Sequence, residues 1–223
     1  MIIKDSQLEW MFKMKSKKND VLFNKTYYEN YAKSTLQHII NCSNNSFINS
    51  DKPDLQSEKL NIGIEVTRAV AKEYGRIQSI TNKYFGKDYS GQYLRGKINK
   101  IIGYDLIHTV GGMAYWMYNF TEKETEDLIL KAINLKSQKL NSGYRVFGKN
   151  YLYIFINNSM IEEDTLMHII SEYRNMSFRI KFDKIIINAI DKAYIVSDSV
   201  KSIFFNDGDL NNFKQSVNIL NKK

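Results

Sequence analysis

Apolar and polar residues follow one another along the first third of the chain with the spacing of one helix and three strands. From Asn24 to Asn41, apolar and aromatic side chains recur close to every three or four residues, which predicts a helix. A short strand is predicted at 46–48. The segments 53–56 and 61–67 are two further predicted strands, joined by the polar turn SEKLN.

The middle of the chain contains a helix whose start is clearly marked. Thr121, with Glu124 three residues later, forms a capping-box pattern that predicts a helix from there to about Leu140. A Ser-Gly pair follows and ends it. Residues 68–85 also have a helical pattern and lead into a basic stretch that contains glycines.

Three strands and one more helix complete the pattern. The apolar run 151–156 has the length of a strand, and a helix is predicted at 162–173. Two further strands, at 184–190 and 192–197, form a hairpin that turns at Asp191. We therefore predict an α/β (α+β) fold in which a mixed β-sheet is flanked by helices.

Composition narrows the class of protein. The 223 residues include a single cysteine, Cys42, so no intramolecular disulfide can form, and a reducing compartment is favoured. No apolar run approaches the length of about 18 residues that a membrane span needs. The first residues contain acidic side chains and no cleavable apolar core. We therefore expect a cytoplasmic protein without a membrane partner.

Positive charge is concentrated in one segment. The net charge is +8 and the pI is about 9.3. Between Arg68 and Lys100 the chain has eight basic and two acidic residues, which accounts for six of the eight net charges. Tyrosines and a phenylalanine are interleaved with the cations, a mixture that favours nucleic acid, although a solvated lysine-rich face is an equal alternative. The candidate nucleic-acid-binding residues are Arg68, Lys72, Arg76, Arg95, Lys97 and Lys100.

The strand at 61–67 carries one carboxylate among apolar residues. Side chains alternate between the two faces of a strand, so Ile64 and Val66 point to one face and Glu65 points to the other. The apolar face belongs in the core. A solvated carboxylate on an ordinary surface hairpin is one interpretation of Glu65.

The turn at 57–61 suggests which residues face each other across the hairpin. If the turn is centred between Lys59 and Leu60, Asp54 lies opposite Glu65. Two carboxylates with Cβ atoms about 5 Å apart repel each other unless a cation or a proton offsets their charge. A divalent ion such as Mg²⁺ or Mn²⁺ would do so, and it would serve hydrolysis of a phosphodiester.

These residues resemble a known motif. Pro53-Asp54 and, after ten intervening residues, Glu65-Val66-Thr67 resemble the PD-(D/E)xK nuclease superfamily, the restriction-endonuclease-like group. The resemblance implies a core of helix, three strands, helix and strand. It also implies that Asp54 and Glu65 are metal ligands and that the Val66 carbonyl is a third.

The resemblance implies further site residues and one departure. Glu29, on the helix before the sheet, matches an additional carboxylate of the family, and Gln56 has the strand position to line the site. Thr67 stands where the family has its lysine. Two lysines are candidates to replace it. Lys52 would lie opposite Thr67 in the assumed register, and Lys72 lies just after the strand.

Composition and the family resemblance together predict the domain organisation. One proline and no repeat or flexible linker predict a single domain over 1–223. It would contain a nuclease-like core at about 24–156, with a basic helical insertion at about 68–120. A C-terminal helix and strands would occupy 157–223. Lysines 131, 136 and 139 lie on the predicted helix beside the site, although a solvated helix face is the plainer interpretation.

Two functions remain open at this stage. The first is metal-dependent hydrolysis of DNA phosphodiester bonds by a restriction-like endonuclease that uses Mg²⁺ or Mn²⁺. The second is a catalytically inactive module that retains the nuclease fold and binds nucleic acid or protein. The threonine at position 67, where the family has lysine, favours this second function. DNA is the expected partner, and a homodimer is left open.

Overall fold

The computed structural model describes residues 25–43, 46–72, 75, 93, 96, 107–110, 113–116, 121–156, 161–189, 191–197 and 199–220. The chain divides into two compact units. The smaller comprises 1–23 and 71–119, and the larger comprises 24–70 and 120–223. The prediction of a single domain with a basic helical insertion at about 68–120 stays a prediction.

The larger unit is built around a mixed sheet, which confirms the predicted α/β class. Seven strands in the order β1-β2-β3-β6-β7-β8-β9 form this sheet. They are β1 (Ile48–Asn49), β2 (Leu55–Ser57), β3 (Ile62–Arg68), β6 (Lys149–Phe155), β7 (Lys184–Asn188), β8 (Lys192–Val196) and β9 (Val200–Phe204). Its described helices are α2 (Lys25–Ile40), α5 (Glu122–Asn141), α6 (Glu163–Asn175) and α7 (Asp207–Leu220).

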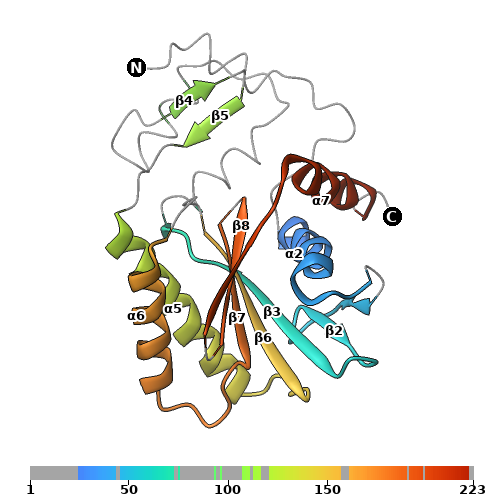
Figure 1. Cartoon of the computed structure of the whole chain (residues 1–223), viewed down its shortest axis with the longest axis vertical. Helices are drawn as coiled ribbons and strands as arrows, with labels where there is room; N and C mark the ends of the chain where they lie inside the picture. Colours follow the sequence, from blue (N-terminus) through green and yellow to red (C-terminus); the bar gives the residue numbers. More distant parts are fainter. Residues whose placement is uncertain are drawn as a thin grey trace. The chain divides into compact units, whose positions relative to one another are not determined.

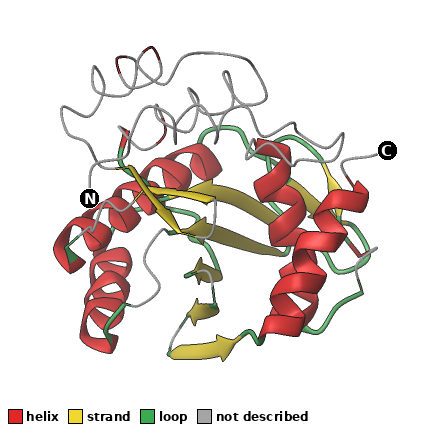
Figure 2. Ribbon diagram, turned by 90° about the horizontal axis from the view of Figure 1, so that it is seen from above, coloured by secondary structure: helices red, strands yellow, loops and turns green. Residues whose placement is uncertain are grey.

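Helices cover both faces of the sheet. In Figure 1, α5 and α6 lie on one side of the strands while α2 and α7 lie on the other, and Figure 2 shows the same two layers from above. The central pairs β3–β6 and β6–β7 are parallel, and the pairs on either side are antiparallel. A parallel pair needs a long crossover, which α5 and α6 provide. The central strands are therefore buried on both faces.

The two faces of β6 have different cores. Leu152 and Ile154 point into an aliphatic core under α5 and α6. Tyr153 and Phe155 point toward α2, where the Tyr153 hydroxyl lies 2.7 Å from Thr35 Oγ1 and the Phe155 ring packs edge-on against Tyr31. Because paired residues of adjacent strands share a face, this alternation also fixes the faces of β3.

The capping box begins α5 as predicted. The Thr121 side chain accepts a hydrogen bond from the Glu124 backbone N–H, and the Glu124 side chain accepts one from the Thr121 N–H. The predicted strand at 46–48 is found as β1, one or two residues later. Strand β9 and helix α7 were not predicted, nor was a hairpin in the smaller unit, β4 (Ile107–Val110) with β5 (Met113–Trp116).

Candidate functional site

The hairpin of β2 and β3 has the register that the sequence predicts. Leu55 pairs with Ile64, and Ser57 pairs with Ile62, so the turn is centred between Lys59 and Leu60. Asn61, at the end of the turn, has a φ of 50°. Asparagine tolerates this left-handed conformation better than most residues do. The polar turn thus sets which residues meet where β2 begins.

Asp54 directly precedes β2 and lies beside the Glu65 strand. Its carboxylate is buried, with 3% of the residue exposed, and its Oδ2 accepts a hydrogen bond of 2.9 Å from the Val66 N–H. The N–H and C=O of one strand residue point to the same side of the strand. The Val66 carbonyl is therefore directed toward the Asp54 side, as the resemblance requires of a third ligand.

A glycine allows the segment before β2 to lie against β3. A Cβ atom added to Gly63 would come within 2.8 Å of the Pro53 ring and 2.6 Å of the Phe147 ring. Real Cβ atoms do not approach other atoms so closely, because van der Waals repulsion forbids it. The absence of a side chain at Gly63 therefore lets Pro53, and with it Asp54, pack at this position.

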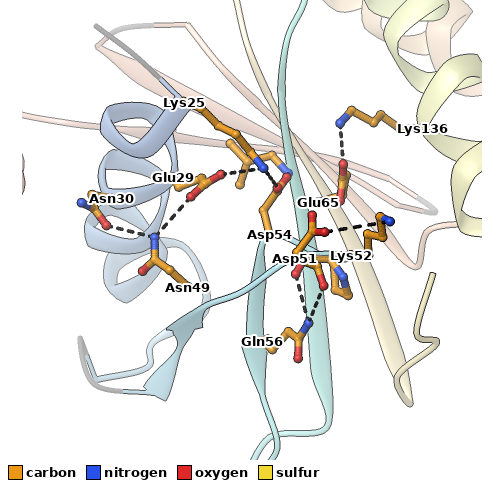
Figure 3. Close-up of polar contacts among 12 residues, drawn as sticks. Lys25, Glu29, Asn30, Asn49, Asp51, Lys52, Asp54, Gln56, Glu65 and Lys136 are labelled. Carbon is orange, nitrogen blue, oxygen red and sulfur yellow. Dashed lines mark hydrogen bonds and ion pairs between the residues drawn. The ribbon is translucent and has the colours of Figure 1, made fainter. Parts of the chain in front are cut away.

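On the α2 side of the sheet, one lysine joins two carboxylates. Lys25 Nζ lies 3.0 Å from Asp54 Oδ1 and 3.3 Å from Glu29 Oε1 (Figure 3). Asn49 Nδ2 donates to Glu29 Oε2 at 3.4 Å. Glu29 is buried, yet its Oε1 has no hydrogen-bond partner among the described residues. Among the described residues, Lys25 is thus the only cation that pairs with Glu29.

On the α5 side, a second lysine meets the other carboxylate. Lys136 Nζ contacts Glu65 Oε1, and the Tyr144 hydroxyl donates to the same oxygen at 3.2 Å. Glu65 is 3% exposed. Its second oxygen, Oε2, is buried and has no hydrogen-bond partner in the described part of the chain. Both donors therefore hold one oxygen of Glu65 and leave the other available.

Burial shifts the proton affinities of these groups. It raises the pKa of Glu65 above its ordinary value, against the opposing effect of Lys136, and the nearby Asp54 charge raises it further. Burial and the Asp54 charge also raise the pKa of Glu29. The hydrogen bond to Asp54 raises the pKa of Lys25, which keeps its ammonium charged. The site therefore concentrates negative charge that burial makes unfavourable.

The interpretation of Glu65 as a solvated carboxylate on a surface hairpin was wrong. It assumed that only one face of the hairpin is covered. Glu65 pairs with Leu152, so it shares the face that α5 covers, while Ile64 and Val66 face the other way. A strand in the centre of a sheet with helices on both faces has no solvated side.

The predicted pairing of Lys52 with Thr67 is not part of the sheet. Strand β2 begins only at Leu55, and Lys52 has a φ of 58°, which takes the chain out of the strand conformation before Asp54. Lys52 is 62% exposed by its side chain, and its Nζ lies 4.0 Å from Asp51 Oδ2. Thr67 is half-buried and pairs with Ile154 of β6.

The remaining predicted site residues are Gln56, which contacts the backbone before β2, and Lys72, which belongs to the smaller unit. Gln56 is buried, and its Nε2 donates to the Pro53 carbonyl at 3.1 Å and to the Asp51 carbonyl at 3.4 Å. It therefore fastens the segment that carries Asp54. Lys72 is exposed and belongs to the smaller unit.

The candidate nucleic-acid-binding residues are described only in part. The Arg68 guanidinium lies over the Tyr28 ring, 4.6 Å from its centroid, so the last residue of β3 is already engaged in a cation–π contact. Lys72 is described above. The remaining candidates lie outside the described residues: Arg76, Arg95, Lys97 and Lys100.

Sequence reasoning missed Lys25 and Tyr144, and it named Lys136 only as one of three lysines on the helix beside the site. Lys25 stands four residues before Glu29, a spacing at which opposite charges meet on a helix, so that signal was available. Lys136 is 71 positions from Glu65. Its helix face carried other lysines, and the pattern alone does not single it out. Tyr144 lies after α5 and had no local signal.

The oxygen donors suit a hard divalent cation in kind. Mg²⁺ and Mn²⁺ bind through one or two carboxylates together with carbonyls and waters. Glu29 Oε1 and Glu65 Oε2 are buried and unsatisfied, and Asp54 lies between these two residues in Figure 3. Within the described ranges, no three His, Cys, Asp or Glu side chains are already grouped for a metal ion. Lysines contact the carboxylates instead.

Comparisons with models of known protein families, with curated proteins and with solved structures found no match for this chain. Among the helices of the described ranges, none combines the length and the hydropathy that a transmembrane span requires. The candidate site therefore has to be interpreted from its own geometry.

Proposed function

We propose that this protein hydrolyses DNA phosphodiester bonds with the help of Mg²⁺ or Mn²⁺. One observation carries the proposal: Asp54 and Glu65 are both buried, the Asp54 charge acts on Glu65, and Glu65 keeps a buried oxygen without a hydrogen-bond partner among the described residues. Two close buried carboxylates are costly unless a cation offsets them. Within the larger unit, the order α2, β1, β2, β3, α5, β6 supports the resemblance to PD-(D/E)xK nucleases, with β4 and β5 of the smaller unit between β3 and α5 in the chain.

The residues around the hairpin have distinct proposed roles. Asp54 and Glu65 would hold the ion, with the Val66 carbonyl as a third ligand and Glu29 as an additional carboxylate. When bound, a divalent ion polarises a phosphoryl oxygen and lowers the pKa of an attacking water. Tyr144 positions Glu65 by holding Oε1. Gln56 holds the loop before β2.

Lys136 is the proposed replacement for the motif lysine at Thr67. Its Nζ contacts Glu65 from α5, on the same face of the sheet as the Thr67 side chain. A fixed ammonium at that place stabilises negative charge that develops on a phosphoryl group. The contact supports Lys136 over Lys52, which pairs with Asp51, and over Lys72.

DNA is the proposed substrate because of where the positive charge lies. The segment 68–100 follows β3 directly and carries six net positive charges. Cations on such a segment neutralise phosphates and release counterions. A cytoplasmic location belongs to the same proposal, since the lone Cys42 is a free thiol.

A second candidate is an inactive module that keeps the nuclease fold. A specific observation favours it, because Lys25 and Lys136 already supply positive charge to Asp54, Glu29 and Glu65. Such a network can be a self-sufficient structural device. Metal binding without cleavage, or neither, would then be observed.

Calorimetric titration with Mn²⁺ and a Mg²⁺-dependent cleavage assay on plasmid DNA test the proposal together. Wild-type protein should bind Mn²⁺ and cut the plasmid, and Asp54→Asn should abolish both. Asp51→Asn is the matched control, because this carboxylate is close in the chain and exposed, and it should behave as wild type. Binding without cleavage would identify the inactive module. Absence of Mn²⁺ binding to wild type would overturn the metal site.

A further inference from the structure

We infer that Lys25 is an internal cation that competes with the divalent ion for Asp54 and must leave before the ion binds. The inference rests on the proposed function, because it concerns the same carboxylates. It assigns Lys25 a regulatory role that neither the motif nor the predicted site residues include.

The two oxygens of Asp54 are engaged differently. Oδ2 accepts the 2.9 Å hydrogen bond from the Val66 N–H, which belongs to the backbone and cannot move away without disturbing β3. Oδ1 is contacted by Lys25 Nζ at 3.0 Å. An incoming cation would therefore be directed to Oδ1, which is the oxygen that the ammonium contacts.

Glu29 shows that the ammonium is an incomplete partner. Lys25 Nζ is 3.3 Å from Glu29 Oε1, but that oxygen has no hydrogen bond from any described residue. The ammonium thus lies closer to Asp54, at 3.0 Å, than to Glu29. A divalent ion has twice the charge of an ammonium group and binds several oxygen ligands at once. It can therefore neutralise and coordinate both carboxylates.

Lys25 is also free to leave. Its side chain is 67% exposed, whereas that of Lys136 is 17% exposed. An exposed ammonium regains most of its hydration when it moves into solvent, whereas the buried carboxylates of Asp54 and Glu29 then need the charge of the incoming ion. Lys25 is the first residue of α2, where the side chain can swing away without breaking the helix.

One lysine contacts an oxygen of each carboxylate. Lys25 Nζ lies between Asp54 Oδ1 and Glu29 Oε1. Release of Lys25 therefore frees both oxygens together, and a single side-chain movement opens both carboxylates to an incoming ion.

The affinity for Mn²⁺ alone tests this inference. Lys25→Met removes the competitor, so Mn²⁺ should bind about three- to tenfold more tightly than to wild type, the range expected for the loss of one exposed ion pair. Lys25→Arg keeps the competing charge and should stay within about twofold of wild type. Lys139→Met, which removes an exposed lysine of α5, is the matched control and should change nothing.

A second measurement follows Lys25 itself. Wild-type protein is treated briefly with acetic anhydride, with and without Mg²⁺, and acetylation is quantified by mass spectrometry. Mg²⁺ should increase the acetylation of Lys25 severalfold relative to Lys139, because the released amine loses its carboxylate partners. This readout does not depend on cleavage activity.

These outcomes distinguish a failure of the proposed role of Lys25 from a failure of the proposed function. Equal or weaker Mn²⁺ binding by Lys25→Met, with Lys25 acetylation unchanged by Mg²⁺, would overturn the role of Lys25 and leave the proposed function standing. Absence of Mn²⁺ binding to wild type, Lys25→Met and Lys25→Arg alike would overturn both.

Discussion

Two lysines neutralise the candidate-site carboxylates, and they come from helices on opposite faces of the sheet. Lys25 of α2 is mostly exposed and contacts Asp54 and Glu29. Lys136 of α5 is mostly buried and contacts Glu65, to which the Tyr144 hydroxyl also donates. The carboxylates are buried in both cases, and the two ammonium groups differ in their exposure.

The difference shows that burial decides what such a pair does. The Lys25 ammonium is mostly hydrated, so it can leave its buried carboxylate partners without losing hydration. A buried pair loses hydration on both sides, and removing one partner leaves an uncompensated charge that costs about 3–5 kcal/mol. Lys136 is accordingly a structural part of the site, and Lys25 is an exchangeable one.

The largest expected effect comes from breaking the buried pair. Lys136→Met should lower the free energy of unfolding by about 3 kcal/mol at neutral pH, measured by urea denaturation, because Glu65 keeps a buried charge without its ammonium. Adding Glu65→Gln in the same chain should restore most of the loss. A double variant as unstable as the single one would show that Lys136 contributes through packing.

The same variant has a predictable pH dependence. Burial raises the pKa of Glu65, and loss of Lys136 raises it further. A carboxyl group whose folded pKa is raised contributes stability below its unfolded pKa of about 4.3, and this contribution is lost as the pH rises through the folded pKa. The deficit of Lys136→Met relative to wild type should therefore shrink as the pH falls from 7 toward 4.5. A constant deficit would contradict a charge effect.

A smaller effect on stability is expected from displacing the segment that carries Asp54. Gly63→Ala places a Cβ against Pro53 and Phe147, and overpacking of this kind costs about 1–3 kcal/mol. Since Pro53 precedes Asp54, Mn²⁺ affinity should fall as well. Gly75→Ala is the control, because a Cβ there meets nothing within 4 Å. Unchanged stability and Mn²⁺ affinity in Gly63→Ala would show that the segment adjusts freely.

Removing the Tyr144 hydroxyl that donates to Glu65 should have a still smaller effect on stability. Tyr144→Phe deletes one donor to Oε1 at a half-buried position, and we expect a loss of about 1 kcal/mol in the free energy of unfolding. Lys136 stays in place, so the pH dependence should resemble that of wild type. A loss as large as that of Lys136→Met would make the tyrosine an equal partner.

The last effect on stability concerns the lysine with the exposed ammonium. In the absence of metal, Lys25→Met should lower the free energy of unfolding less than Lys136→Met does, because the Lys25 ammonium is mostly hydrated although Asp54 and Glu29 are buried. Thermal and urea unfolding measure this directly. A loss of several kcal/mol would remove the distinction between the two lysines.

The part of the site that the sequence predicted is the part formed by neighbours in the chain. The polar turn between β2 and β3 set the register of the hairpin, in which Leu55 pairs with Ile64. The capping box at Thr121 marked the start of α5. In both cases the determining residues lie within a few positions of one another, so local pattern is sufficient.

The parts that sequence reasoning missed depend on tertiary contacts or on a pattern that was overlooked. The burial of Glu65 follows from β6 and α5, which no local alternation can show. Lys52 was misplaced because strand pairing was extended past the true start of β2. Helix α7 did have a signal, since Leu210, Phe213 and Val217 recur at helical spacing.

The sequence separation of the site's contacts sets the order in which the site assembles during folding. Asp54 and Val66 are 12 positions apart, whereas Glu65 and Lys136 are 71 apart. Closing the longer loop costs about 1.5 kcal/mol more chain entropy, and non-local contacts form more slowly. The hairpin can therefore form early with its carboxylates hydrated, and Glu65 meets its ammonium only when α5 docks on the sheet. Desolvation and neutralisation of Glu65 thus occur in the same late step.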